Sequence, residues 1–80
     1  MNSVTLYSKP GCHLCESAQD ELKRLERRYP HMLTVVDITT DGSLLQRYGE
    51  RIPVVEIGGR EYAAPLNPQV LERALRTARK

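Results

Sequence analysis

The sequence predicts an α/β fold: one domain over residues 1–80, with a four-stranded mixed sheet and helices on both faces. Three observations lead to this class. Short β-branched runs alternate with segments of helical periodicity, turn-forming residues separate these segments, and 80 residues can build only one modest core. The strands are apolar on both sides, so helices must cover both faces. The expected order is strand, helix, strand, helix, strand, strand, helix.

The first half of the chain predicts two parallel strands joined by a helix. Residues 4–7 form the first strand, residues 12 to about 28 the helix, and residues 33–38 the second strand. A full helix between two strands requires a parallel pair with a right-handed crossover. Pro30 stops the helix. Spacings of three and four place these apolar residues on one helix face: Leu14, Ala18, Leu22, Leu25 and, beyond them, Tyr29.

A short helix over about 43–48 follows the second strand. Thr40 or Asp41 can cap its start, and Gly49 ends it. Its apolar residues, which should turn inward, are Leu44, Leu45 and Tyr48.

The last third predicts a hairpin and a final helix. Strands over 54–57 and 60–63 flank Gly58-Gly59, because glycine adopts positive φ freely at both turn positions. Asn67 followed by Pro68 is typical of a helix cap and first turn. The apolar positions of this helix are Val70, Leu71, Ala74, Leu75 and Ala78.

Cys12 and Cys15 are the only cysteines, and they stand at the start of the first helix. A disulfide-stapled secreted protein would need four or more, and a loop this short restrains the chain little. We therefore interpret the pair as catalytic or metal-binding, in a reducing compartment, which makes the cytoplasm the expected location. A zinc site shared with His13 and His31 is disfavoured, since His31 lies beyond a helix about 24 Å long.

The charge pattern argues against nucleic-acid and membrane partners. The formal net charge is +2, and a locally basic stretch ends the chain at Arg73, Arg76, Arg79 and Lys80. Without an accompanying nucleic-acid motif, these cations are interpreted as complementing a helix C-terminus.

No apolar run approaches the about 20 residues of a membrane span. The N-terminus lacks the basic start and apolar core of a signal peptide.

The element order, with Cys-x-x-Cys opening the first helix, resembles the thioredoxin fold in its minimal glutaredoxin-like form over essentially the whole chain. Residues 6–15, Leu-Tyr-Ser-Lys-Pro-Gly-Cys-His-Leu-Cys, are similar to the glutaredoxin active-site strand and loop. Ile52-Pro53-Val54 resembles the cis-proline motif of that family. Residues 9–15 also resemble the active site of small bacterial glutaredoxin-like proteins that begins Lys-Pro-Gly-Cys-His-Leu-Cys.

This resemblance implies a dithiol thiol–disulfide oxidoreductase that reduces protein or glutathione mixed disulfides. Cys12 is the expected nucleophile, because a helix N-terminus lowers the pKa of a thiol below the about 8.5 of free cysteine. The backbone amides of Leu14 and Cys15 are its expected hydrogen-bond donors. Cys15, one turn deeper and more buried, would attack the mixed disulfide and release the substrate.

The expected substrate-binding residues are Lys9, His13, Arg51, Ile52 and Pro53. The resemblance suggests that Lys9 pairs with a carboxylate of the substrate; the alternative is a solvated lysine. A cis bond before Pro53 would turn the backbone N–H and C=O of Ile52 toward the nucleophile. His13 and Arg51 either supply positive charge at the site or face water.

Two electron donors stay open, glutathione or a flavoenzyme reductase. Where typical glutaredoxins have Gly-Gly and an acidic or hydroxyl residue for glutathione, residues 63–67 read Ala-Ala-Pro-Leu-Asn. We expect a monomer without bound cofactor or metal that acts on disulfide-containing proteins. Alternatives are a non-catalytic redox-sensing or metal-binding module, and an iron–sulfur carrier. Monothiol glutaredoxins that carry clusters use Cys-Gly-Phe-Ser, and this chain has Cys15 in place of that serine.

Overall fold

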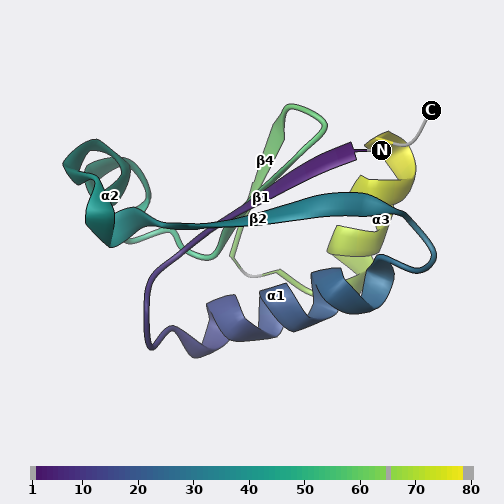
Figure 1. Cartoon of the computed structure of the whole chain (residues 1–80), viewed down its shortest axis with the longest axis horizontal. Coiled ribbons are helices and arrows are strands. Elements are labelled where there is room, and N and C mark those ends of the chain that lie inside the picture. The colour runs from purple at the N-terminus through teal and green to yellow at the C-terminus, as the bar shows by residue number, and fades with distance from the viewer. Residues whose placement is uncertain (1, 65, 79–80) are drawn as a thin grey trace.

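Figure 1 shows the computed structural model of the chain, which describes residues 2–64 and 66–78. The predictions that fall on Pro65, Arg79 and Lys80 lie outside these described residues. The predicted order of elements is confirmed, with one short 3-10 helix, η1, added. The elements are β1 (Asn2–Ser8), α1 (His13–Leu25), β2 (His31–Asp37), η1 (Ile38–Thr40), α2 (Gly42–Tyr48), β3 (Val54–Ile57), β4 (Arg60–Ala63) and α3 (Pro68–Ala78).

The four strands form one mixed sheet in the order β2-β1-β3-β4. β1 pairs with β2 in parallel, and β3 pairs with β1 and β4 in antiparallel fashion. The parallel register places Ser8 beside Asp37 at the carboxyl ends of β1 and β2. Because α1 begins shortly after Ser8, this end of the sheet also positions the cysteines.

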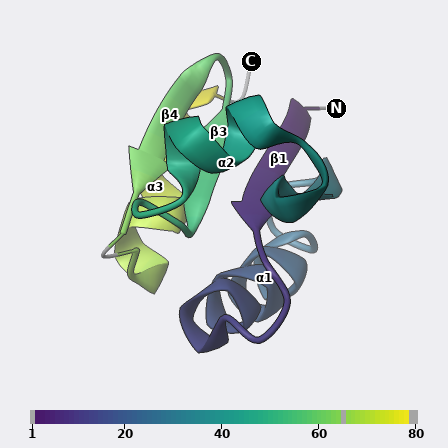
Figure 2. The same ribbon diagram turned by 90° about the vertical axis from the view of Figure 1, so that its left-hand side faces the viewer.

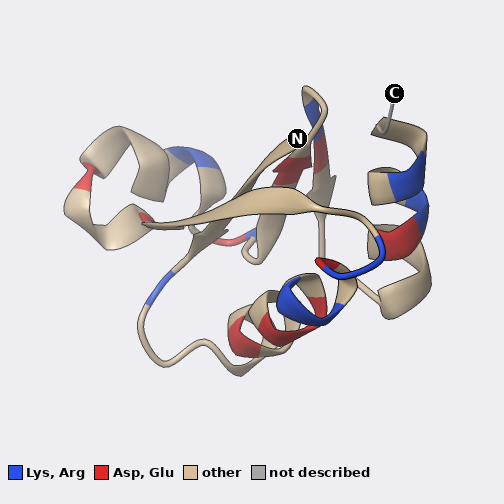
Figure 3. Cartoon of the chain, turned by 45° about the vertical axis from the view of Figure 1, so that its right-hand side comes forward, with Lys and Arg blue, Asp and Glu red and all other residues tan. Residues whose placement is uncertain are grey.

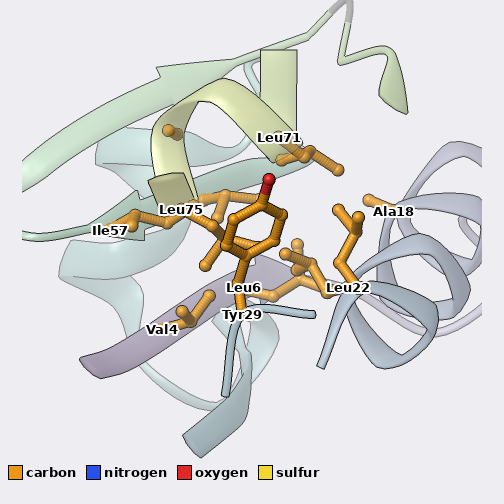
Figure 4. Close-up of a cluster of buried hydrophobic side chains, with 11 residues drawn as sticks. Val4, Leu6, Ala18, Leu22, Tyr29, Ile57, Leu71 and Leu75 are labelled. Carbon is orange, nitrogen blue, oxygen red and sulfur yellow. The ribbon is translucent and has the colours of Figure 1, made fainter. Parts of the chain in front are cut away.

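The main core lies between one sheet face and the helices α1 and α3, as Figure 4 shows. Val55 and Ile57 of β3 point into it, while Val54, the residue before them, points to the other face, the alternation expected of a strand. The fully or nearly buried members of this core are Val4, Leu6, Ala18, Leu22, Leu25, Tyr29, Val55, Ile57, Leu71, Ala74 and Leu75.

A smaller core covers one end of the opposite face and confirms that helices lie on both sides of the sheet. It gathers Ile38 of η1, Tyr48 of α2 and Val54 of β3. The ring of Tyr7 stacks on that of Tyr48, with 4.3 Å between centroids. Figure 2 views the molecule from the end at which α2 lies. Farther along β2, Met32 is 64% exposed, so α2 covers only part of this face.

The first helix is shorter than predicted, and its apolar face is shifted. It ends at Leu25, whose carbonyl accepts the N–H groups of Arg28 (3.1 Å) and Tyr29 (2.9 Å). This turn carries Tyr29 into the main core before Pro30 is reached, so tertiary packing decides where the helix ends. Leu14 is 66% exposed, contrary to the prediction, because Cys15 takes the buried place one turn before Ala18.

The segment from β2 to α2 differs from the prediction in the bounds of β2 and in the exposure of Leu45, and of the two predicted caps of α2 it uses one. β2 begins at His31 and ends at Asp37, because the Asp37 carboxylate accepts the Thr39 N–H (2.9 Å) and starts η1. Asp41, rather than Thr40, caps α2 by accepting the N–H of Ser43. Leu45 does not turn inward and is 46% exposed.

The C-terminal boundaries are confirmed. β3 and β4 span the predicted residues, and the turn between them has φ of 59° at Gly58 and 83° at Gly59. Asn67 caps α3 by accepting the N–H of Val70 at 2.8 Å. Leu71, Ala74 and Leu75 are buried.

Tyr48 should titrate abnormally because of its position in the second core. Its buried hydroxyl donates to the Glu61 carboxylate at 2.5 Å, and this bond, with burial, raises the pKa of Tyr48 from 10.0 to about 12. A raised folded-state pKa stabilises the fold fully below the unfolded pKa of about 10, and this stabilisation is lost as pH rises toward the folded value. The absorbance of tyrosinate should be followed against pH in the protein and in Tyr48→Phe. The difference between the two curves should show one group that titrates near the raised pKa of Tyr48.

Glu61→Gln is the matched control for this titration. The substitution keeps the size of the side chain but removes the charged acceptor, so the pKa of Tyr48 should move back toward 10.0. A difference curve centred at the ordinary tyrosine pKa in the unmodified protein would contradict the assignment.

Candidate functional site

Cys12 is the N-cap of α1. Its backbone is extended (φ −88°, ψ 106°), and its Sγ accepts the N–H of Cys15 at 3.2 Å. The turn that delivers it has Gly11 at φ +79°, a conformation that favours glycine, and a Cys12 N–H bond to the Lys9 carbonyl (3.3 Å). Of the two predicted donors, the amide of Cys15 is the one that reaches Sγ in the described structure.

This position favours a thiolate at Cys12. The first N–H groups of a helix lack backbone partners, and their partial positive charge stabilises an anion. A hydrogen bond to the charged form lowers the pKa of the group that accepts it. Cys12 is partly exposed, whereas Cys15 is 3% exposed, as the sequence predicted. Of the two cysteines, Cys12 is therefore the one with surface exposed to solvent.

The two cysteines are joined as a disulfide in the structure. Their Cα atoms lie 5.2 Å apart, within the range of about 4.4 to 6.8 Å that permits the bond without backbone movement. The same backbone can therefore carry either the disulfide or two thiols.

An open pocket of about 250 Å³ adjoins the disulfide and contains both sulfur-bearing residues and Lys9. It brings together the loop of residues 9–11, one face of α1 and the end of β2. Its lining residues are Ser8, Lys9, Pro10, Gly11, Cys12, Cys15, Glu16, Gln19 and Asp37.

Glu16, Gln19 and Asp37 were not predicted as site residues, although the sequence contains features that point to each of them. Cys12, Cys15, Glu16 and Gln19 follow the i, i+3, i+4, i+7 spacing of one helix face. Asp37 ends the strand beside β1, and the carboxyl ends of parallel strands meet at one sheet edge.

Asp37 supplies a fixed negative charge to the pocket. The hydroxyl of Thr39 (2.6 Å) and then its backbone N–H (2.9 Å) donate to the Asp37 carboxylate and lower its pKa. Among the lining side chains, Lys9 is therefore the cation, and Asp37 and Glu16 are the acids.

The other predicted substrate-binding residues do not line this pocket. The His13 side chain is 96% exposed, with Nδ1 3.9 Å from Glu16 Oε1, and Arg51 is exposed as well. Ile52 packs against the second core, and Pro53 is buried. The bond between these two residues is cis.

The prediction that Ile52 offers its N–H to a substrate is wrong. This N–H donates to the Tyr48 carbonyl at 3.1 Å, and the N–H of Arg51 donates to the same oxygen at 2.8 Å. Both bonds close the turn that follows α2.

Three further observations concern the part of the chain that the structure describes. No cluster of three or more His, Cys, Asp or Glu side chains there could hold a metal ion. His31 is buried, with Nδ1 2.6 Å from the Tyr29 carbonyl oxygen. None of the helices in residues 2–64 and 66–78 has the length and apolar character needed to cross a membrane.

Comparisons with known proteins identify relatives of this chain in sequence and in fold. Residues 3–78 match the model of a family described as "Glutaredoxin-like domain (DUF836)". No curated protein matches the sequence significantly. The chain is similar to the structural genomics target protein XcR50 from X. campestris, with 32% identity over 92% of this chain and 96% of that one, and a TM-score of 0.80.

Two more solved structures are similar. Protein Ne2328 from Nitrosomonas europaea is 27% identical over 90% of this chain and 88% of its own, with a TM-score of 0.76. Thioredoxin O2 from Arabidopsis thaliana, in its oxidized state, is 21% identical over 96% of this chain and 74% of its own, with a TM-score of 0.69. At that identity, the second likeness concerns the fold alone.

Proposed function

Since the chain belongs to the glutaredoxin-like domain family (DUF836) and has a thioredoxin-like fold, we propose that it is a dithiol thiol–disulfide oxidoreductase. One observation carries this proposal. The partly exposed sulfur of Cys12 caps α1 and accepts an N–H bond, while the buried Cys15 lies within disulfide reach of it. An activated thiol with a second thiol one turn away is the arrangement that reversible dithiol chemistry needs.

The proposed reaction has two exchange steps. The Cys12 thiolate attacks one sulfur of the substrate disulfide, the substrate S–S bond breaks, and the departing sulfur takes up a proton. Cys15 then loses its proton and attacks the Cys12 sulfur of the mixed disulfide. The second substrate thiol leaves, the Cys12–Cys15 disulfide forms, and two electrons have passed to the substrate.

Lys9 is the proposed substrate contact within the pocket, where its ammonium can pair with a substrate carboxylate. The Ile52 carbonyl and Pro53 remain proposed contacts for the substrate backbone. His13 and Arg51 are exposed and could meet a substrate from outside the pocket. The acids Asp37 and Glu16 favour substrates that carry a cation beside the disulfide.

We further propose a monomer that acts in the cytoplasm on disulfide-containing proteins, without a resident cofactor or metal and without nucleic-acid or membrane partners. A reducing compartment keeps such a pair available as thiols. Glutathione and a flavoenzyme reductase can both return it to the dithiol state. An assay that follows one model disulfide, coupled in turn to each donor system, distinguishes them.

Cys15→Ser should trap the intermediate of this reaction. The variant keeps the attacking thiol but lacks the one that resolves the mixed disulfide, so one substrate half should stay attached to Cys12. Intact-mass spectrometry without reductant measures the adduct, and a strong reductant should remove it.

Cys12→Ser is the control for the trapping experiment and should form no equivalent adduct. If both variants bind a substrate protein equally and neither forms an adduct, the chain is a non-catalytic binding module and the proposed reaction is wrong.

A further inference from the structure

A second hollow lies between the strand β4 and the helix α3 and shares no residue with the dithiol pocket. Its volume is about 460 Å³. Arg60 and Tyr62 line it from β4, and Val70, Arg73, Ala74 and Thr77 line it from α3. We call this hollow the β4–α3 cleft.

The periodicities of the two elements build the cleft. Arg60 and Tyr62 are two residues apart in a strand, so they share one face, while Glu61 between them points to the other. Gln69 also lines the cleft from α3, and the other four α3 residues follow the i, i+3, i+4, i+7 spacing of one helix face. The result is a partly apolar floor with an arginine on either wall.

The acidic neighbours of these arginines are engaged elsewhere. Glu61 accepts the hydroxyl of Tyr48, and Glu72 accepts that of Tyr29 and pairs with Arg28 at 3.3 Å. No Asp or Glu lines the cleft, and within the described residues Arg60 and Arg73 form no ion pair.

Positive charge also continues along α3. Arg76 lies beside Arg73 in a shallower hollow that includes Glu72. Figure 3 shows basic positions on α3 and at the tip of the β3–β4 hairpin. The wall of the cleft is therefore complementary to an anionic ligand.

The edge position of β4 indicates the shape of that ligand. β4 is the last strand in the sheet order, and β3 pairs with one side of it. Backbone groups on the free side of an edge strand can pair with an extended peptide. The four residues of β4 span about 13 Å, enough to align a short segment beside the cleft.

We propose that the β4–α3 cleft binds an extended acidic segment of a partner protein. The segment adds to the free edge of β4, and its carboxylates pair with Arg60 and Arg73, whose planar guanidinium groups suit bidentate contact. Side chains at positions i and i+2 of an extended segment share one face, so its carboxylates and its apolar side chains enter the cleft from that face, the apolar ones against Tyr62, Val70 and Ala74. This binding does not depend on the dithiol, so it should persist in Cys12→Ser.

The test uses a fluorescein-labelled peptide of about eight residues, long enough to pair with a strand, in which Glu and Val alternate along one face and Ser fills the positions between them. Fluorescence anisotropy should show binding that weakens as salt increases. Arg60→Glu and Arg73→Glu should each reduce affinity by about tenfold or more, the loss expected for one charge-assisted contact. Circular dichroism checks that the variants are folded, and Arg60→Gln and Arg73→Gln should give smaller losses.

Arg27→Glu is the matched control, because it makes the same charge change at an exposed arginine outside the cleft. The affinity of Arg27→Glu for the peptide should equal that of the unmodified protein. In amide NMR spectra, the peptide should shift signals in β4 and along residues 70–77.

Four results would overturn the proposal: no binding at the highest soluble peptide concentration, equal binding of a Lys-Val peptide, an Arg27→Glu loss as large as that of Arg60→Glu, or peptide-induced shifts outside β4 and α3. Displacement of the peptide by inorganic phosphate, with no shift in the β4 amides, would instead assign the cleft to a small anion and also overturn it.

Discussion

Cys12→Ser should abolish disulfide reduction, lowering turnover by about a thousandfold or more, as removal of a catalytic nucleophile does. A serine hydroxyl at the start of α1 still accepts the N–H of Cys15, but it cannot form the S–S bond on which the exchange depends. The measurement is the rate of reduction of a model disulfide, coupled to each of the two electron donors.

Cys12→Ser should keep the fold and should still bind substrate proteins. Sulfur and oxygen both serve at an N-cap, and Cys12 lies outside both hydrophobic cores. The thermal transition of Cys12→Ser should therefore be compared with that of the reduced unmodified protein, which also lacks the disulfide. Unchanged turnover in Cys12→Ser would disprove the enzyme proposal, whatever the donor.

Leu22→Ala should have the largest effect on stability. Leu22 is 0% exposed. It points from α1 into the main core, which it shares with residues of β1 and α3 (Figure 4). Truncation of such a leucine lowers the free energy of unfolding by about 2 to 5 kcal/mol. For a domain of this size, each kcal/mol corresponds to a Tm decrease of about 4 to 8 °C.

Leu14→Ala is the matched control for this truncation. It removes the same atoms from the same helix, but Leu14 is 66% exposed. Its free energy of unfolding should change by no more than about 0.5 kcal/mol. Urea or thermal unfolding, followed by circular dichroism, measures both variants, and equal losses would mean that Leu22 is not a core residue.

The elements that were predicted most accurately are those with local signals. Gly58-Gly59 and Asn67-Pro68 determine their turn and cap within a few residues, and both boundaries are confirmed. The end of α1 depends instead on where Tyr29 packs against α3, which is a contact between distant segments. Local propensity cannot reveal such a contact.

In the candidate site too, features with local signals were predicted, and features that depend on contacts between distant segments were not. The spacing of Cys12 and Cys15 sufficed to predict which sulfur is exposed and which is buried. The N–H of Ile52 was assigned wrongly, because its bond to Tyr48 arises from the turn after α2, whose course the sequence does not specify. Asp37 was missed because its place in the pocket follows from strand pairing.

That pairing makes the charge beside the sulfurs a property of strand alignment. Adjacent residues of a strand point to opposite sides, so a slip of one residue between β1 and β2 would remove the Asp37 carboxylate from the rim and present an apolar neighbour instead. Substitutions near Asn2, at the other end of β1, would act on this charge through the pairing of the two strands, although Asn2 lies more than 30 residues before Asp37 in the sequence.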